Sequence, residues 1–240
     1  MSERRWHLGF LYPGYSAEDD YPRIETMIDP PVQISVVHTT IGEDAHREDA
    51  LLDAGSGWRL HEGAAELKRR GVHTAMWACT SGSFVFGVDG ARQQARAVEE
   101  FLGVPVSSTS LAFVEAARAL GLRRVAVAAT YPVGIAALFT KFLADCGIGA
   151  TDVSGLGIIT GVEVGGLGRE QVLALATGND HADAEAVLLP DTALHTVAWL
   201  EALEDACRKP VLTANQVTVW QALRLAGHPA KQRGLGRLFL

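Results

Sequence analysis

The feature that most constrains the fold is a regular alternation of short apolar runs and amphipathic stretches along the whole chain. Stretches with helical apolar spacing, such as WRLHEGAAELKRRG and IAALFTKFLADCG, separate the runs, and several of them end on glycine. Such alternation predicts an α/β fold in which parallel sheet is flanked by helices. The runs with the composition of buried strands are HLGFLYP from His7, VQISVVHTT from Val32, HTAMWA from His73, RVAVAAT from Arg124, AEAVLLP from Ala184 and KPVLTA from Lys209.

A weak internal repeat runs through this pattern. HTAMWACT and EAVLLPDT are both apolar strands that end in a cysteine or an aspartate followed by threonine. Each is followed by a helix and then by a strand entered through proline, VPVSSTS and KPVLTAN. No linker rich in Pro, Gly or Ser separates the halves, so we expect two tightly packed α/β lobes with the chain crossing between them more than once. We assign residues 1–112 and 214–240 to the first lobe and residues 113–213 to the second.

Composition excludes several classes of protein. The 240 residues suffice for a large core, and 48% of them are hydrophobic. A net charge of −7 without a block of Lys and Arg argues against a nucleic-acid partner. The start of the chain does not have the pattern of a secretory leader, and no window has the length of an apolar membrane span. Three widely spaced cysteines form neither a disulfide framework nor metal-binding pairs, so we expect a reduced, cytoplasmic protein.

Ligands of parallel α/β sheets bind at the carboxyl ends of the strands. None of the segments expected there contains lysine or arginine, and most are rich in hydroxyl side chains. Hydroxyls and the free N–H groups of helix starts can hold a carboxylate or a phosphate without a cation. These segments are YPGYSAEDDY, CTSGS, SSTS, TYP, PDTALHT and TANQ.

Cys79 ends the third apolar run and is the first candidate for chemistry. If a helix begins near Ser81, its positive end lowers the pKa of the thiol and makes it a nucleophile or a proton carrier. The alternative is a buried cysteine that acts as a small hydrophobic residue. Cys146 and Cys207 fall near the ends of helical stretches, and we expect both to be structural.

Asp191 follows the strand AEAVLLP, at the position that matches Cys79 in the repeat. Its carboxylate can serve as a second acid or base on the opposite side of a substrate. The alternative is an N-cap for the helix TVAWLEALEDACR, since aspartate is a favoured cap. His195 is close enough in sequence to orient Asp191, although an ordinary boundary histidine is the simpler interpretation. Tyr131 is either a ligand hydroxyl or a buried ring with one satisfied oxygen.

Other chemistries lack their motifs. GLGIITG, from Gly155, does not have the GxGxxG spacing and follows no clear strand, so a dinucleotide site is not expected. The chain has no GxxxxGK[ST] and no GxSxG segment. Its histidines are scattered and do not cluster with cysteines, so the sequence supports no metal site.

Taken together, these motifs resemble the aspartate/glutamate racemase superfamily, and most closely the branch that holds the maleate cis–trans isomerases and the arylmalonate decarboxylases. The resemblance covers most of the chain after about residue 60. It rests on ACTSGSFV, GLRRVAVAATY, LGIITGVEV, AVLLPDTALHT, KPVLTANQVTVWQALRLAG and GLGRLF.

This resemblance implies two pseudo-symmetric lobes with the active site in the cleft between them, and no metal or organic cofactor. In the racemases and isomerases one cysteine from each lobe flanks the substrate, whereas the decarboxylases usually have glycine first and the protonating cysteine second. Here the first position falls on Cys79 and the second on Asp191, which matches neither pattern. The resemblance assigns substrate carboxylate binding to Thr80, Ser81 and Tyr131. The N-terminal loop YPGYSAEDDY also departs from the PSSN-like stretch of the isomerases.

Our first expectation is a cofactor-independent isomerase of the maleate type that acts on a small dicarboxylate, with Cys79 as nucleophile or proton carrier, Asp191 as acid or base, and Thr192 as a further substrate-binding residue. The second is an arylmalonate-type decarboxylase in which Cys79 donates the proton. The third is a dicarboxylate-binding protein without turnover. Exposed apolar residues on the helices are compatible with a homo-oligomer, and GVEVGGLG, from Gly161, is a candidate lid.

Overall fold

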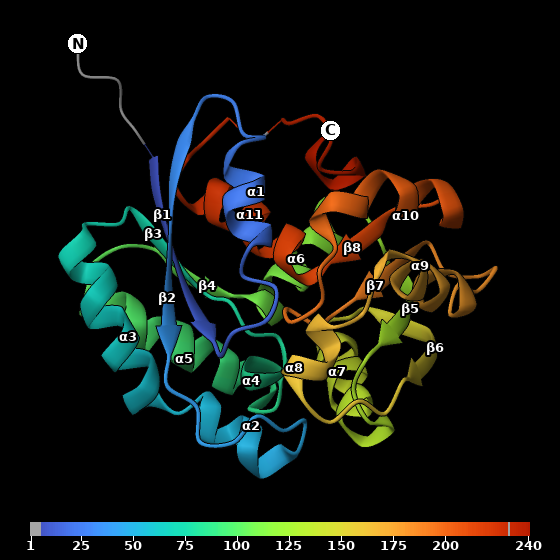
Figure 1. Cartoon of the computed structure of the whole chain (residues 1–240), viewed down its shortest axis with the longest axis horizontal. Helices are drawn as coiled ribbons and strands as arrows, with labels where there is room; N and C mark the ends of the chain where they lie inside the picture. The colour runs from blue at the N-terminus through green and yellow to red at the C-terminus, as the bar shows by residue number, and fades with distance from the viewer. Residues whose placement is uncertain (1–5, 230) are drawn as a thin grey trace.

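The computed structural model describes residues 6–229 and 231–240, and in this part of the chain the strands form two four-stranded parallel sheets (Figure 1). Residues 1–5, which belong to the predicted first lobe and to the start of the chain searched for a leader, lie outside the described residues. The first sheet has the order β2-β1-β3-β4, and the second has the order β6-β5-β7-β8. The strands are β1 Trp6–Pro13, β2 Val32–Thr39, β3 Thr74–Trp77, β4 Val106–Ser108, β5 Arg124–Ala129, β6 Gly149–Gly155, β7 Ala186–Leu189 and β8 Val211–Thr213.

The two sheets repeat one another, which confirms the predicted pair of α/β lobes. β3 and β7, the two strands of the internal repeat, hold the same place in their sheets. β6 was not predicted, because GATDVSG has too little apolar character to stand out as a strand. GLGIITG therefore does follow a strand, and the statement that it follows none is wrong.

Helices cover both faces of the first sheet. The amphipathic helices α3 (Gly57–Arg70) and α5 (Gly87–Leu102) pack against one face, where Leu60 and Leu67 meet Trp77. α3 ends at Gly71, whose φ of 67° suits a residue without a side chain. The other face is covered by α1 Asp20–Glu25, α6 Thr109–Ala119 and α11 Ala214–Leu225.

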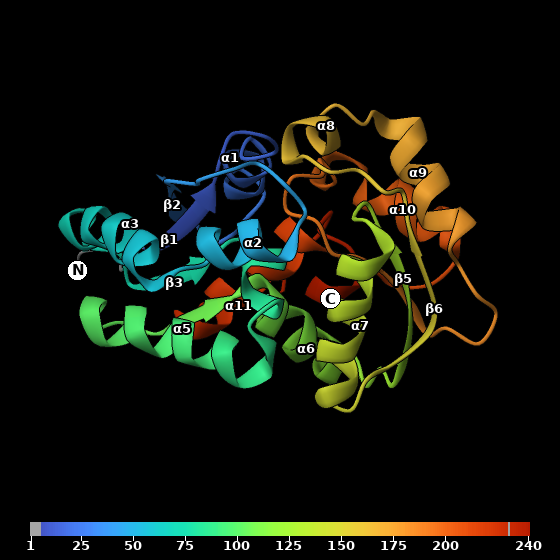
Figure 2. The ribbon, with the colours of Figure 1, turned by 90° about the horizontal axis from the view of Figure 1, so that it is seen from below.

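α11 returns from the second sheet and packs on α6 and on the first sheet, so the chain crosses between the lobes as expected. The predicted boundary at residue 112 falls inside α6, and the exact limits of the lobes stay a prediction. In Figure 2 the first lobe with α3 and α5 lies on the left, and the second lobe with α9 and α10 on the right.

The second sheet is also flanked on both faces. The helices and 3₁₀ turns of this region are α7 Val133–Asp145, α8 Gly161–Gly165, α9 Arg169–Gly178, η1 Val197–Trp199 and α10 Leu200–Cys207, and the remaining ones are α2 Glu48–Ala54, α4 Ser81–Phe84 and η2 Arg237–Phe239. Cys146 lies at the end of α7 and Cys207 at the end of α10, as the sequence predicts. Within the described residues, no helix is long and apolar enough to cross a membrane.

One apolar core is shared by both lobes. Side chains of a strand alternate between its faces, so Val125 and Val127 of β5 point into the same core as Leu8 and Phe10 of β1. Ala126, on the other face of β5, packs in a separate cluster under α9 and α10. The shared core holds the two sheets in one arrangement and brings their carboxyl ends together at the candidate site.

Candidate active site

A cavity of about 240 Å³ lies where the carboxyl ends of the two sheets meet. Four of the predicted site residues line it, namely Cys79, Ser81, Asp191 and Thr192. All four side chains belong to buried residues. The rest of the wall comes from the end of β1 and the loop after it, residues 41–46, α2, the start of α8, and Ala193. A cavity of this size admits a small substrate.

Cys79 and Asp191 reach the cavity from equivalent places. Each lies two residues after the end of its strand, Cys79 after β3 and Asp191 after β7. A threonine follows each of them, Thr80 and Thr192. The repeat recognised in the sequence therefore brings a thiol and a carboxylate, from equivalent places in the two lobes, to the cavity.

The thiol of Cys79 is held by the turn that follows it. The backbone N–H of Gly82 donates to Sγ at 3.2 Å, and the hydroxyl of Ser81 lies 3.8 Å from Sγ. A Cβ atom at Gly82 would come within 3.1 Å of Sγ, so a side chain there would crowd the sulfur. α4 begins at Ser81, as expected, but it comprises only Ser81–Phe84.

Burial raises the pKa of the Cys79 thiol to about 11, and the charge of Asp191 acts in the same direction. The N–H of Gly82 and the hydroxyl of Ser81 oppose this shift and are outweighed. The expected lowering of the pKa is therefore wrong, because a single helical turn does not compensate for complete desolvation. At neutral pH the site presents a protonated thiol.

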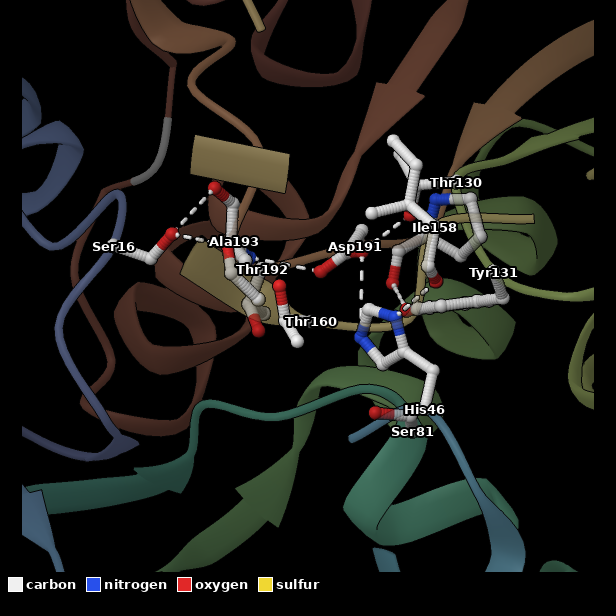
Figure 3. A network of polar contacts seen from close by, with 12 residues as sticks. Ser16, His46, Ser81, Thr130, Tyr131, Ile158, Thr160, Asp191, Thr192 and Ala193 are labelled. Atoms are coloured by element: carbon white, nitrogen blue, oxygen red, sulfur yellow. Dashed lines mark hydrogen bonds and ion pairs between the residues drawn. The ribbon is translucent and has the colours of Figure 1, made fainter. Parts of the chain in front are cut away.

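Asp191 is buried and has two hydrogen-bond donors (Figure 3). The hydroxyl of Thr130 donates to Oδ2, and the backbone N–H of Ala193 donates to Oδ1 at 2.9 Å. The next helical turn begins only at Val197, so Asp191 caps the turn at Ala193 and not the helix. The N-cap interpretation is wrong, and the carboxylate is available at the cavity wall.

The histidine beside Asp191 is His46, which the sequence did not single out. Nε2 of His46 lies 3.8 Å from Oδ2 of Asp191, and both side chains are buried. His195 instead pairs with Asp19, with 3.1 Å between Nδ1 and Oδ1. His46 stands in the polar segment EDAHRED, which has no periodicity, so no local signal identifies it.

Thr80 and Tyr131 lie behind the wall, and neither lines the cavity. The hydroxyl of Tyr131 donates to the carbonyl of Pro190 at 2.6 Å, as a buried ring with one satisfied oxygen would. Burial, together with the neighbouring charge of Asp191, raises the pKa of Tyr131 well above its usual range. Oγ1 of Thr80 is fully buried and lies beside the hydroxyl of Tyr131. The substrate-binding roles of Thr80 and Tyr131 stay predictions.

Much of the remaining wall is apolar. α2 contributes Ala50, Leu51 and Ala54, and Ile41 and Val162 add to the same surface. No lysine or arginine is among the described residues that line the cavity. Nor do residues 6–229 and 231–240 contain a group of three or more His, Cys, Asp or Glu side chains arranged to hold a metal ion.

α8, the start of the predicted lid, is held against the first lobe. The carboxylate of Asp44 accepts hydrogen bonds from the N–H groups of Gly161 at 2.8 Å and Val162 at 3.1 Å. The hydroxyl of Ser16 donates to the carbonyls of Gly161 at 2.9 Å and Ala193 at 3.1 Å. These contacts close the cavity wall between the lobes.

Comparison with known proteins identifies the family. The sequence pattern of the arylmalonate decarboxylase family matches residues 57–239. The arylmalonate decarboxylase of Bordetella bronchiseptica is 33% identical over 182 residues, which are 73% of this chain and 75% of that protein. A maleate isomerase of Nocardia farcinica is 28% identical over 179 residues, which are 72% of this chain and 71% of that protein.

Solved structures agree with this assignment. A crystal structure of arylmalonate decarboxylase has a TM-score of 0.79 at 28% identity and covers 97% of this chain and 98% of its own. The maleate cis–trans isomerase of N. farcinica bound to TRIS shares the fold, with a TM-score of 0.89 at 24% identity over 98% of this chain and 97% of its own. The named relatives are thus decarboxylases and isomerases. The chain belongs to the arylmalonate decarboxylase family, in the branch of the aspartate/glutamate racemase superfamily that also holds the maleate isomerases.

Proposed function

We propose that this protein is a cofactor-independent decarboxylase of malonates that carry an apolar substituent at C2, with Cys79 as the proton donor. The observation that carries this proposal is the buried thiol of Cys79, which faces a largely apolar cavity. With a pKa raised to about 11, Cys79 keeps its proton at neutral pH. Decarboxylation needs that proton for the carbanion, whereas addition to the double bond of maleate needs a thiolate.

The proposed reaction breaks one C–C bond and forms one C–H bond. The bond between C2 and one carboxylate breaks, CO₂ leaves, and the electron pair stays on C2, delocalised into the remaining carboxylate. Cys79 then gives its S–H proton to C2, and the thiolate takes a proton from water before the next cycle. The nearby charge of Asp191 favours the protonated form of Cys79, which supports the return of this proton.

Substrate binding divides between two parts of the wall. We assign the retained carboxylate to the hydroxyls of Ser81 and Thr192, because these two of the four predicted binding residues line the cavity. We assign the substituent at C2 to the surface formed by Leu51 and Ala54 of α2 with Ile41. A maleate dianion has no apolar group to occupy that surface.

Isomerisation of a maleate-like substrate is the second candidate. The contact that favours it is the N–H of Gly82 on Sγ of Cys79, since this donor would stabilise a thiolate. Asp191 would then supply the acid or base on the opposite side. Maleate isomerases of Alcaligenes faecalis and N. farcinica are 25% and 28% identical to this chain.

Proton NMR in deuterated water separates these candidates. Phenylmalonate and maleate are incubated with the unaltered protein, with Cys79→Ala, and with Cys146→Ala as a matched control that removes a partly exposed thiol outside the cavity. We expect phenylacetate deuterated at C2 from phenylmalonate, with activity lost in Cys79→Ala and kept in Cys146→Ala. Fumarate from maleate would replace the proposal with the isomerase. Binding of either acid without any turnover would favour the dicarboxylate-binding protein.

A further inference from the structure

His46 reaches the cavity from a segment without regular structure between β2 and α2, yet its ring is fixed in place (Figure 3). Its Nδ1 lies 2.9 Å from the carbonyl oxygen of Ile158, and its backbone N–H donates to the carbonyl of Ile159 at 2.6 Å. The ring also packs edge-on against Tyr131, with 4.8 Å between the ring centroids. The ring therefore belongs to the wall between the lobes, and its side chain is only 7% exposed.

The contact with Ile158 determines which nitrogen carries a proton. A carbonyl oxygen only accepts hydrogen bonds, so Nδ1 must be the N–H donor. Nε2 is left facing Oδ2 of Asp191 at 3.8 Å. A lone pair on Nε2 would repel the carboxylate, whereas a proton on Nε2 turns the contact into an ion pair.

A proton on Nε2 affects substrate binding because the other titratable groups around the cavity are acidic. The titratable groups that contact His46 are Asp191 and Tyr131. The other titratable residues that line the cavity are Tyr12, Tyr15, Glu43, Asp44 and Cys79. None of them supplies a positive charge, and no lysine or arginine is among the described lining residues. A substrate with two carboxylates therefore meets acidic groups with one basic side chain to balance them.

We infer that His46 is a positioning and specificity residue: protonated at Nε2, it balances the charge of Asp191 and thereby admits a doubly charged substrate. This inference rests on the proposed function, because a malonate brings two negative charges into the cavity. Loss of the proton or of the imidazole leaves Asp191 uncompensated beside the substrate. Binding of a dianion then weakens, while binding of a singly charged analogue changes little.

Binding in the Cys79→Ala background tests this without turnover. The ligands are phenylmalonate and its half-amide, which carries one charge, and the added change is His46→Asn, whose side-chain amide can still donate to Ile158. We expect the Kd of phenylmalonate to rise about tenfold or more and that of the half-amide to change less than twofold. Adding Asp191→Asn to His46→Asn should restore most of the affinity for phenylmalonate. His61→Asn serves as the control, since His61 packs on Phe101 outside the cavity.

A second readout needs no ligand. In ¹⁵N NMR of the imidazole of the ligand-free protein, we expect both Nδ1 and Nε2 of His46 to carry a proton. Equal loss of affinity for both ligands, or an Nε2 of His46 without a proton, would overturn the inference. Because these measurements do not require catalysis, they distinguish its failure from failure of the proposed decarboxylase function.

Discussion

Cys79 and Asp191 stand at equivalent positions in two sheets of the same strand order, and the charge of Asp191 acts on the thiol of Cys79. In the superfamily that the sequence resembles, the racemases and isomerases carry a cysteine at both positions. The decarboxylases usually carry glycine at the first position and cysteine at the second. The carboxylate of Asp191, after β7, affects the thiol of Cys79, after β3, because its charge favours the thiol over the thiolate. This effect on the thiol supports the proposed role of Cys79 as a proton donor.

The first prediction concerns the reactivity of Cys79. Its alkylation by iodoacetamide, followed by mass spectrometry in a Cys146→Ala, Cys207→Ala background, should accelerate from pH 8 to pH 10 without a plateau, because the thiol pKa is raised to about 11. Asp191→Asn should move this profile to lower pH. A plateau near pH 9, as for an ordinary cysteine of pKa about 8.5, would contradict the assignment.

The second prediction concerns the apolar wall. Ala54→Leu adds three carbons to α2 at the cavity and should raise KM for phenylmalonate by about tenfold while leaving the small methylmalonate within about twofold. The matched control is Leu52→Ala on the exposed side of the same helix. Equal effects on both substrates would show that the substituent does not bind at Ala54.

The third prediction concerns the hydrogen bonds between the carboxylate of Asp44 and the start of α8. Asp44→Ala removes the acceptor for the N–H groups of Gly161 and Val162, so their hydrogen exchange should speed up by about fivefold or more, in line with about 1 kcal/mol for a lost helix cap. Asp44→Asn retains one acceptor oxygen, so its exchange rates should lie between those of Asp44→Ala and those of the unaltered protein. Unchanged exchange rates in Asp44→Ala would mean that the other contacts of α8 hold it in place without Asp44.

The fourth prediction concerns Asp20, a buried carboxylate that accepts hydrogen bonds from Asn215 and from the N–H groups of Thr196 and Val197. Burial raises its pKa despite these donors. The folded state therefore binds the Asp20 proton more tightly than the unfolded state does. This contribution to the free energy of unfolding must fall as the pH rises from the ordinary aspartate pKa, about 3.9, through the folded value.

Urea unfolding from pH 4 to pH 7 measures this contribution. The free energy of unfolding of the unaltered protein, relative to Asp20→Asn, should decline across that range. Asp89→Asn, at a fully exposed carboxylate, should show no such trend. A relative stability of the unaltered protein that increases with pH would reverse the sign and rule out the burial effect.

The sequence by itself determined the class of fold and the two equivalent strand ends that bring Cys79 and Asp191 to the cavity. Alternating strand and helix periodicity is a local property, and it was enough to predict parallel α/β lobes. The repeat of HTAMWACT and EAVLLPDT located Cys79 and Asp191, because equivalent strand ends carry equivalent positions. The sequence did not predict β6, because this segment becomes a strand through its pairing with β5 and not through its composition.

Only the tertiary structure decided how those side chains behave. The pKa of Cys79 moves opposite to the expectation from its helix turn, because desolvation depends on what packs over the thiol from distant parts of the chain. His46 joins Asp191 through contacts with Ile158 and Ile159, more than 100 residues away in sequence. Burial and electrostatic coupling at the site depend on how the two lobes pack against each other. Local sequence patterns therefore do not predict them.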